Sequence, residues 1–147
     1  AIFKGCTSLV DAPVIPDSVL DMSEAFLGDS NIYTASAFPE SVEDISSAYA
    51  DCISLEKAAS IPASVINCDS CYSGCSNLYG ELSINTNTED CANLLSNAVT
   101  SGKTLKLKGK SGRLFEIQQD SGSRYVTIKD TEKAEKNAKK LERQNNQ

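Results

Sequence analysis

The sequence predicts an α/β repeat solenoid in which each 23-residue coil carries one short strand and one short helix. The first observation is that apolar residues recur at one phase every 23 residues. The clearest column is Phe3, Phe26, Tyr49, Tyr72 and Leu95. The second observation is a proline column, formed by Pro16, Pro39 and Pro62. A fixed period of roughly 20 to 29 residues is typical of stacked, leucine-rich-repeat-like coils.

The first part of each coil predicts a short strand. Residues 9–16 end at Pro16, and proline cannot donate a hydrogen bond to a continuing ladder. The equivalent segments are 32–39, 55–62, 78–85 and 104–109. Stacking these segments would make a parallel sheet along one face of residues 1–109.

The second part of each coil predicts a short helix. Ser18 precedes Asp21 by three positions, which is the spacing of a helix N-cap and its third helical residue. The same columns hold Ser41 and Asp44, Ser64 and Asn67, and Asn87 and Asp90. Val19, Met22 and Phe26 then follow at helical spacing. The predicted helix ends are residue types that tolerate a left-handed backbone: Gly5, Gly28, Asp51, Gly74 and Asn97.

Beyond Lys103 the repeat fades and the pattern changes. Residues 104–108, 114–117 and 125–128 alternate between apolar and polar, with turn residues at 120–122. We therefore expect residues 110–130 to form a β-hairpin that caps the exposed end of the sheet. Residues 131–147 form a charged tail with a thin apolar stripe, which predicts either a helix that contacts another chain or a frayed linker.

The charge is strongly asymmetric along the chain. Residues 1–100 hold 14 acidic and 2 basic side chains, whereas residues 101–147 hold 6 acidic and 12 basic ones. The acidic part argues against nucleic acid, whose phosphates it would repel. The basic end favours an assembly contact, including self-association, or is an ordinary solvated surface. No apolar run reaches the ~18 residues of a membrane span. Because the chain begins inside a repeat without Met, we expect it to be part of a longer protein.

The residue types present argue against an enzyme. The chain contains no histidine, which removes histidine-assisted nucleophiles and histidine metal sites. Adjacent carboxylates are explained by the predicted helix starts, where the helix dipole favours anions. These pairs are Glu43 with Asp44 and Glu89 with Asp90. Calcium ligands at Asp11, Asp17 and Glu40 lack a recognisable oxygen spacing. We expect no cofactor and no metal.

Six cysteines leave three interpretations open. Each stands in a column of small or apolar residues, so buried thiols are the first interpretation. The second is a disulfide between stacked coils, for which the candidate pairs are Cys52 with Cys75 and Cys68 with Cys91. The third is a thiolate metal site.

A ligand-binding surface is expected on the exposed strand face, because stacked repeats present a long sheet to partners. Small or apolar side chains recur there at 23-residue spacing: Val14, Ala37, Ser60 and Ser83. Tyr33 and Tyr79 add two aromatic rings that are suited to contact with protein or sugar. The alternative is that these rings only cover the corner of a coil.

Four segments resemble a known family. They are FKGCTSL (3–9), APVIPDSV (12–19), IPASV (61–65) and YSGCSNL (72–78). Residues 1–109 thereby resemble the BspA-type leucine-rich repeats of bacterial surface proteins, with departures at Asp29, Ser36 and Asn85. The resemblance implies a non-catalytic, extracellular or cell-surface module that binds protein or glycan in an adhesin-like role. The repeat also occurs in phage-associated genes, so the alternative is a structural subunit or fibre segment of an assembly such as a virion.

Overall fold

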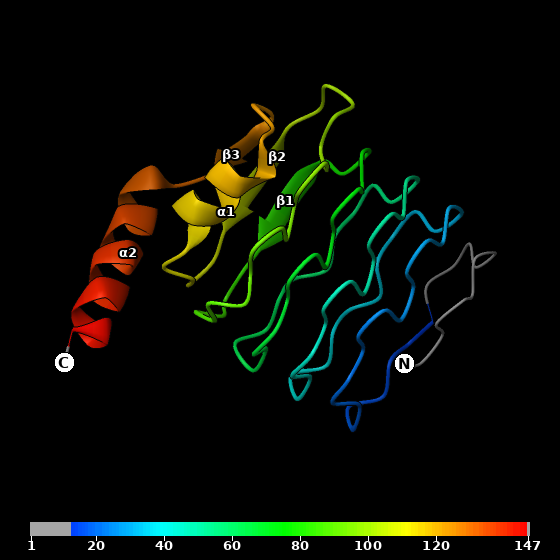
Figure 1. Cartoon of the computed structure of the whole chain (residues 1–147), viewed down its shortest axis with the longest axis horizontal. Helices are drawn as coiled ribbons and strands as arrows, with labels where there is room; N and C mark the ends of the chain where they lie inside the picture. Colours follow the sequence, from blue (N-terminus) through cyan, green and yellow to red (C-terminus); the bar gives the residue numbers. More distant parts are fainter. Residues whose placement is uncertain (1–12, 147) are drawn as a thin grey trace.

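The computed structural model describes residues 13–146. Predictions that concern Phe3, Gly5, Cys6, Leu9 and Asp11 fall outside the described residues. The described chain contains three strands and two helices, all in its C-terminal half. In chain order they are β1 (Gly80–Ser83), β2 (Leu105–Lys108), α1 (Leu114–Ser121), β3 (Val126–Ile128) and α2 (Thr131–Asn145). Figure 1 shows irregular coils lying side by side before β1 and the two helices at the opposite end.

The predicted fold class, an α/β repeat solenoid closed by a hairpin, is wrong. The described residues form a single open sheet of three parallel strands in the order β1-β2-β3, with two helices beside it. Between residues 13 and 79 no strand or helix is present. The coils there are joined at isolated bridges, such as Asp21 with Asp44 and Thr34 with Lys57.

The expected helix in each coil is absent because its main-chain N–H groups bind the neighbouring coil. Met22 N–H donates to Asp44 O at 2.8 Å, and Phe26 N–H donates to Ala48 O at 2.7 Å. Between these residues, Ala25 N–H closes a tight turn on Met22 O at 3.1 Å. Donors committed to the next coil cannot bind four residues back, as a helix requires.

The serine and aspartate columns form turns instead of helix caps. Asp21 Oδ1 accepts a hydrogen bond from Ser23 N–H at 2.8 Å, and Asn67 Oδ1 accepts one from Asp69 N–H at 3.0 Å. Side chains of this type mimic a backbone turn. Ser64 Oγ donates to Val42 O of the preceding coil at 2.7 Å. The polar spacing is therefore real, but it stabilises turns and joins coils.

The left-handed backbone expected at the end of each coil is confirmed for the described members of that column. Their φ angles are +76° at Gly28, +61° at Asp51, +76° at Gly74 and +60° at Asn97. A second left-handed column was not predicted from the sequence. It is formed by Glu24, Ser47, Ser70 and Asn93, with φ between +54° and +62°. Two left-handed corners per coil produce consecutive turns and leave no room for a helix.

The predicted aromatic column forms the centre of the core. Phe26, Tyr49 and Tyr72 are fully buried. The rings of Phe26 and Tyr49 stack at 5.0 Å between centroids, and those of Tyr49 and Tyr72 at 5.7 Å. The Tyr72 hydroxyl donates to Ala59 O and accepts from Ala59 N–H, both at 2.8 Å. The aromatic column therefore packs the coils together and also satisfies main-chain groups.

The hairpin expected over residues 110–130 is also wrong. Residues 114–121 form α1, whose buried residues Leu114, Ile117 and Ser121 follow helical spacing. Gly122, at φ +68°, ends the helix, and β3 then pairs parallel to β2. Parallel neighbours need a crossover, and α1 supplies it. Four alternating residues at 114–117 were too few to distinguish a strand from a helix.

Residues Thr131–Asn145 of the charged tail form α2, whereas a contact of this helix with another chain stays a prediction. Asp130 caps the helix by accepting a hydrogen bond from Lys133 N–H at 3.0 Å. Ala134 is buried, and Asn137 Nδ2 donates to Gly109 O at 3.3 Å. Gly112 lies so close to α2 that an added Cβ would stand 2.7 Å from Asn137 O. The helix therefore packs on the rest of the chain along one face.

Candidate functional site

Three of the predicted binding residues line one long groove across the coils. Val14 and Ala37 border a cavity of about 530 Å³, and Ala37 and Ser60 border a second one of about 560 Å³. The two cavities share Ala35, Ala37 and Phe38. We call these adjoining cavities the long groove. Val14 is 95% exposed at one end of it.

The main chain along the long groove is incompletely paired. Ser36 N–H donates to the Tyr49 hydroxyl and Ala59 N–H to the Tyr72 hydroxyl, each at 2.8 Å. Within the described residues, the N–H groups of Ala37, Ala58 and Ser60 have no acceptor. These donors stand among small side chains, so this part of the groove combines unpaired main-chain groups with apolar surface.

The fourth predicted residue of this column, Ser83, lies in a different cavity. This cavity measures about 400 Å³ and is lined by Ser83 together with Lys108, Lys110, Lys129 and Lys133. We call it the lysine pocket. It shares Asn85 and Lys110 with the long groove, so the two sites adjoin. Residues 108 and 129 stand at the ends of β2 and β3, which places the pocket at the carboxyl edge of the parallel sheet.

The lysine pocket is positioned by a tight turn after β2. Asn85 Oδ1 accepts a hydrogen bond from Lys110 N–H at 3.0 Å. Gly109 has φ +109° and lies against the main chain of Ile84, where an added Cβ would stand 2.3 Å from Ile84 O. Only glycine tolerates both that angle and that approach. Residues 108–110 are therefore held in one place relative to β1.

A carboxylate links two of the four lysines. Glu81 lies 2.6 Å from Lys129 Nζ and 3.0 Å from Lys108 Nζ. Hydrogen bonds from Lys129 and Lys108 lower the pKa of Glu81 to about 2. Lys110 and Lys133 have no carboxylate partner among residues 13–146. Four lysines against the carboxylates of Glu81 and of Asp130, which also lines the pocket, leave a net charge of +2 at this site.

The two predicted tyrosines lie elsewhere. Tyr33 is 52% exposed and borders neither the long groove nor the lysine pocket. Tyr79 is covered by Lys103, whose Nζ stands 4.4 Å from the ring centroid. The structure does not bring either ring to the column of Val14 and Ala37.

The five described cysteines are buried free thiols: Cys52, Cys68, Cys71, Cys75 and Cys91. Cys52 Sγ donates to Phe26 O at 3.1 Å, and Cys75 Sγ donates to Tyr49 O at 3.0 Å. Burial raises the pKa of Cys52 and Cys68 to about 12. Protonated thiols are poor nucleophiles and poor metal ligands. Neither predicted disulfide, Cys52–Cys75 or Cys68–Cys91, is formed in this structure.

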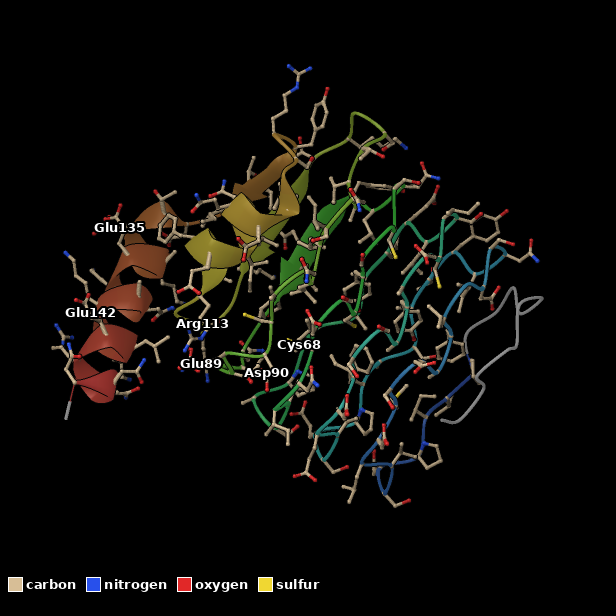
Figure 2. All side chains as sticks on the ribbon, viewed as in Figure 1. Cys68, Glu89, Asp90, Arg113, Glu135 and Glu142 are labelled. Carbon is tan, nitrogen blue, oxygen red and sulfur yellow. The ribbon has the colours of Figure 1, made fainter. Side chains whose placement is uncertain are left out.

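The adjacent carboxylates, Glu43 with Asp44 and Glu89 with Asp90, do not stand at helix starts, because the predicted helices are absent. Asp44 Oδ1 accepts hydrogen bonds from Ser46 N–H at 2.9 Å and from Ser46 Oγ at 2.7 Å. Glu89 lies 3.9 Å from Arg113, and Figure 2 shows these two side chains close together. Among the described residues, no cluster of three or more histidine, cysteine, aspartate or glutamate side chains could hold a metal ion. Asp17 and Glu40 border the long groove.

Sequence reasoning missed the residues that attach the C-terminal unit to the last coil. Asn85 binds Lys110, and Asn87 Oδ1 accepts a hydrogen bond from Gly112 N–H at 2.8 Å. Arg113 Nε donates to Asn87 O at 2.8 Å. The sequence did carry a signal for these residues. Asparagine replaces the proline of one repeat column at Asn85 and the serine of another at Asn87.

Neither helix of the described chain is both long and apolar enough to cross a membrane. Comparisons with protein-family models, with characterised proteins and with solved structures find no match for this chain. Its function must therefore be inferred from the arrangement of its own residues.

Proposed function

We propose that the chain is a non-catalytic binding module that holds an extended segment of another protein in the long groove. The observation that carries this proposal is the groove itself, which combines small side chains with main-chain donors that have no acceptor in the described structure. The resemblance of residues 1–109 to bacterial surface repeats supports a cell-surface or extracellular place for such a module.

A polypeptide suits the groove better than a glycan. Extended peptides bind by pairing their main chain with exposed main-chain groups, and the spacing of small pockets then selects side chains. Ala37 and Ser60 are exposed residues one repeat apart whose N–H groups have no acceptor among the described residues, which fits that mode. A sugar ring would need an exposed aromatic platform, but Phe38 in the groove is only 6% exposed. The tyrosines that could serve lie outside it.

Selection from a display library of random linear dodecapeptides tests the proposal. We expect enriched peptides that shift the amide resonances of residues 35–38 and 58–61. The double variant Ala37→Arg, Ser60→Arg fills the groove from exposed positions and should weaken binding at least tenfold. The matched control is Ser101→Arg, Thr104→Arg, which adds the same two positive charges at exposed residues that border neither cavity.

Three results would overturn the proposal. The first is the absence of any enriched peptide. The second is binding that survives the double variant, and the third is selective retention of oligosaccharides on a glycan array with no peptide binding. Because both substitutions are at exposed positions, an unchanged amide spectrum elsewhere would show that the variant is folded.

A second function, a subunit of a larger assembly, is favoured by the charge of α2. The helix carries five basic and three acidic side chains, and of the five basic ones only Lys136 forms an ion pair within the described residues, 3.5 Å from Glu132. Residues 1–100 are strongly acidic, so a second copy would offer a complementary surface. Light scattering should then show a multimer at low salt that dissociates at about 0.5 M salt, where screening is strong. A monomer at both salt concentrations would argue against this function.

A further inference from the structure

The lysine pocket adjoins the proposed peptide groove, with which it shares Asn85 and Lys110, and has features of a second ligand site. It opens at the carboxyl edge of a parallel sheet, where ligands of such sheets commonly bind. Its volume of about 400 Å³ lies within the range of roughly 300 to 1,000 Å³ found for small-molecule sites.

The charge of the pocket is positive after its internal pairs are counted. Glu81 is shared by Lys108 and Lys129, and the Asp130 carboxylate accepts the N–H that caps α2. Four lysines against the Glu81 and Asp130 carboxylates leave a net charge of +2, and neither Lys110 nor Lys133 forms an ion pair among the described residues. A net positive charge around one cavity attracts an oxyanion.

The main chain that carries these two lysines is fixed before any ligand arrives. Lys110 N–H binds Asn85, and Gly109 is held between Ile84 and Asn137. Lys133 N–H donates to Asp130 Oδ1, the cap of α2. A site with a fixed main chain loses less conformational entropy on binding. The lysine side chains themselves can adjust to the ligand.

The rest of the lining is apolar. Leu114 and Ala134 are buried core residues whose side chains border the cavity. The lining therefore offers apolar contact for the carbon skeleton of a small organic molecule and lysines for its charged group. We propose that the lysine pocket binds a small organic molecule through a multiply charged oxyanion, either a phosphate or clustered carboxylates.

Amide chemical shifts of the full chain, titrated with sodium phosphate or with sodium citrate at constant ionic strength, test this proposal. We expect saturable shifts confined to residues 108–111 and 129–134. The probe that saturates the pocket at the lower concentration identifies the oxyanion as a phosphate or as clustered carboxylates. The double variant Lys110→Gln, Lys133→Gln should weaken the tighter probe at least tenfold. The matched control Lys139→Gln, Lys140→Gln removes the same charge from α2 outside the pocket and should leave the affinity unchanged.

The proposal is overturned by shifts that rise linearly without saturation, or by equal weakening in the two double variants. Either result would show general screening of a basic surface. Peptide binding in the long groove is measured separately with Ala37→Arg, Ser60→Arg. Lys133→Gln changes a residue that lines the lysine pocket and not the long groove, so each site can fail without the other. Each single variant, Lys110→Gln and Lys133→Gln, should lose part of the affinity and keep the wild-type amide spectrum, which excludes unfolding as the cause.

Discussion

The side-chain oxygen of Asn85 accepts a hydrogen bond from the main-chain N–H of Lys110 at 3.0 Å. Asn85 stands in the column that holds proline in the earlier coils, and its own N–H donates to Ile61 O at 3.0 Å. A proline could make neither bond, because it has no N–H and no side-chain acceptor. The loss of the repeat at this position therefore marks the place where the C-terminal unit joins the coils.

Asn85→Ala should lower the free energy of unfolding by about 1 kcal/mol, because it leaves Lys110 N–H without its acceptor. Asn85→Pro restores the repeat residue and should cost more, about 2 to 3 kcal/mol, because it also removes the bond to Ile61 O. Urea unfolding followed by circular dichroism measures both values. A proline variant as stable as the wild type would contradict this role of Asn85.

Tyr72→Phe should destabilise the chain by about 1 to 3 kcal/mol. The hydroxyl bonds with both Ala59 N–H and Ala59 O at 2.8 Å, and both groups would lose a partner on the removal of one oxygen. A phenyl ring fits this column, since Phe26 is buried in it, so the loss should come from the hydroxyl alone. Tyr33→Phe, at a half-exposed position, should change the urea midpoint little. Equal midpoints for the two variants would show that the Tyr72 hydroxyl contributes nothing.

The sequence was sufficient to predict the buried columns and one left-handed column, because both depend on residue type at a fixed period. It was insufficient to predict where the main-chain donors bind. Val19, Met22 and Phe26 have helical spacing, yet Met22 and Phe26 donate to the next coil. Apolar spacing reports which side chains are buried, and a coil of consecutive turns buries the same ones. That ambiguity produced the wrong fold class.

The two candidate sites differed in how far sequence could predict them. Val14, Ala37 and Ser60 were predicted as one exposed column because they share a repeat position. The lysine pocket was not predicted, because Lys110 and Lys133 belong to no repeat and meet only through α1, β3 and the docking of α2. Contacts of that kind depend on tertiary packing, which no local pattern encodes.

Gly109→Ala should lower the free energy of unfolding by at least 2 kcal/mol. The added methyl group would stand 2.3 Å from Ile84 O and 2.7 Å from Ile84 N, both main-chain atoms that cannot move aside. Gly80→Ala is the matched control, because Gly80 has a similar φ of +91° but open space around its Cβ position. The control should cost only about 1 kcal/mol for the backbone angle. Comparable losses in the two variants would contradict the close approach to Ile84.

Stability should fall as the pH rises above about 9, partly through the buried thiols. Burial raises the pKa of Cys52 from 9.0 to about 12. Between these values the unfolded chain releases a proton that the folded chain keeps, so deprotonation favours unfolding. The stabilising contribution is complete below pH 9 and is lost as the pH approaches 12. Cys52→Ala should therefore show a shallower fall in the urea midpoint between pH 8 and pH 11 than the wild type. Parallel curves for the two proteins would exclude this thiol as a cause.

Glu81 should titrate far below an ordinary glutamate. Hydrogen bonds from Lys129 and Lys108 lower its pKa from 4.5 to about 2. Its depressed pKa stabilises the folded chain above pH 4.5, and this contribution is lost as the pH falls from 4.5 towards 2. Carboxyl carbon shifts recorded by nuclear magnetic resonance give the pKa directly. Lys129→Gln should raise the pKa of Glu81 towards 4.5, because it removes the nearer ammonium group at 2.6 Å, whereas Lys139→Gln on α2 should leave it unchanged. A Glu81 pKa near 4.5 in the wild type would mean that the two lysines do not hold this carboxylate, and that both are free to add their charge to the lysine pocket.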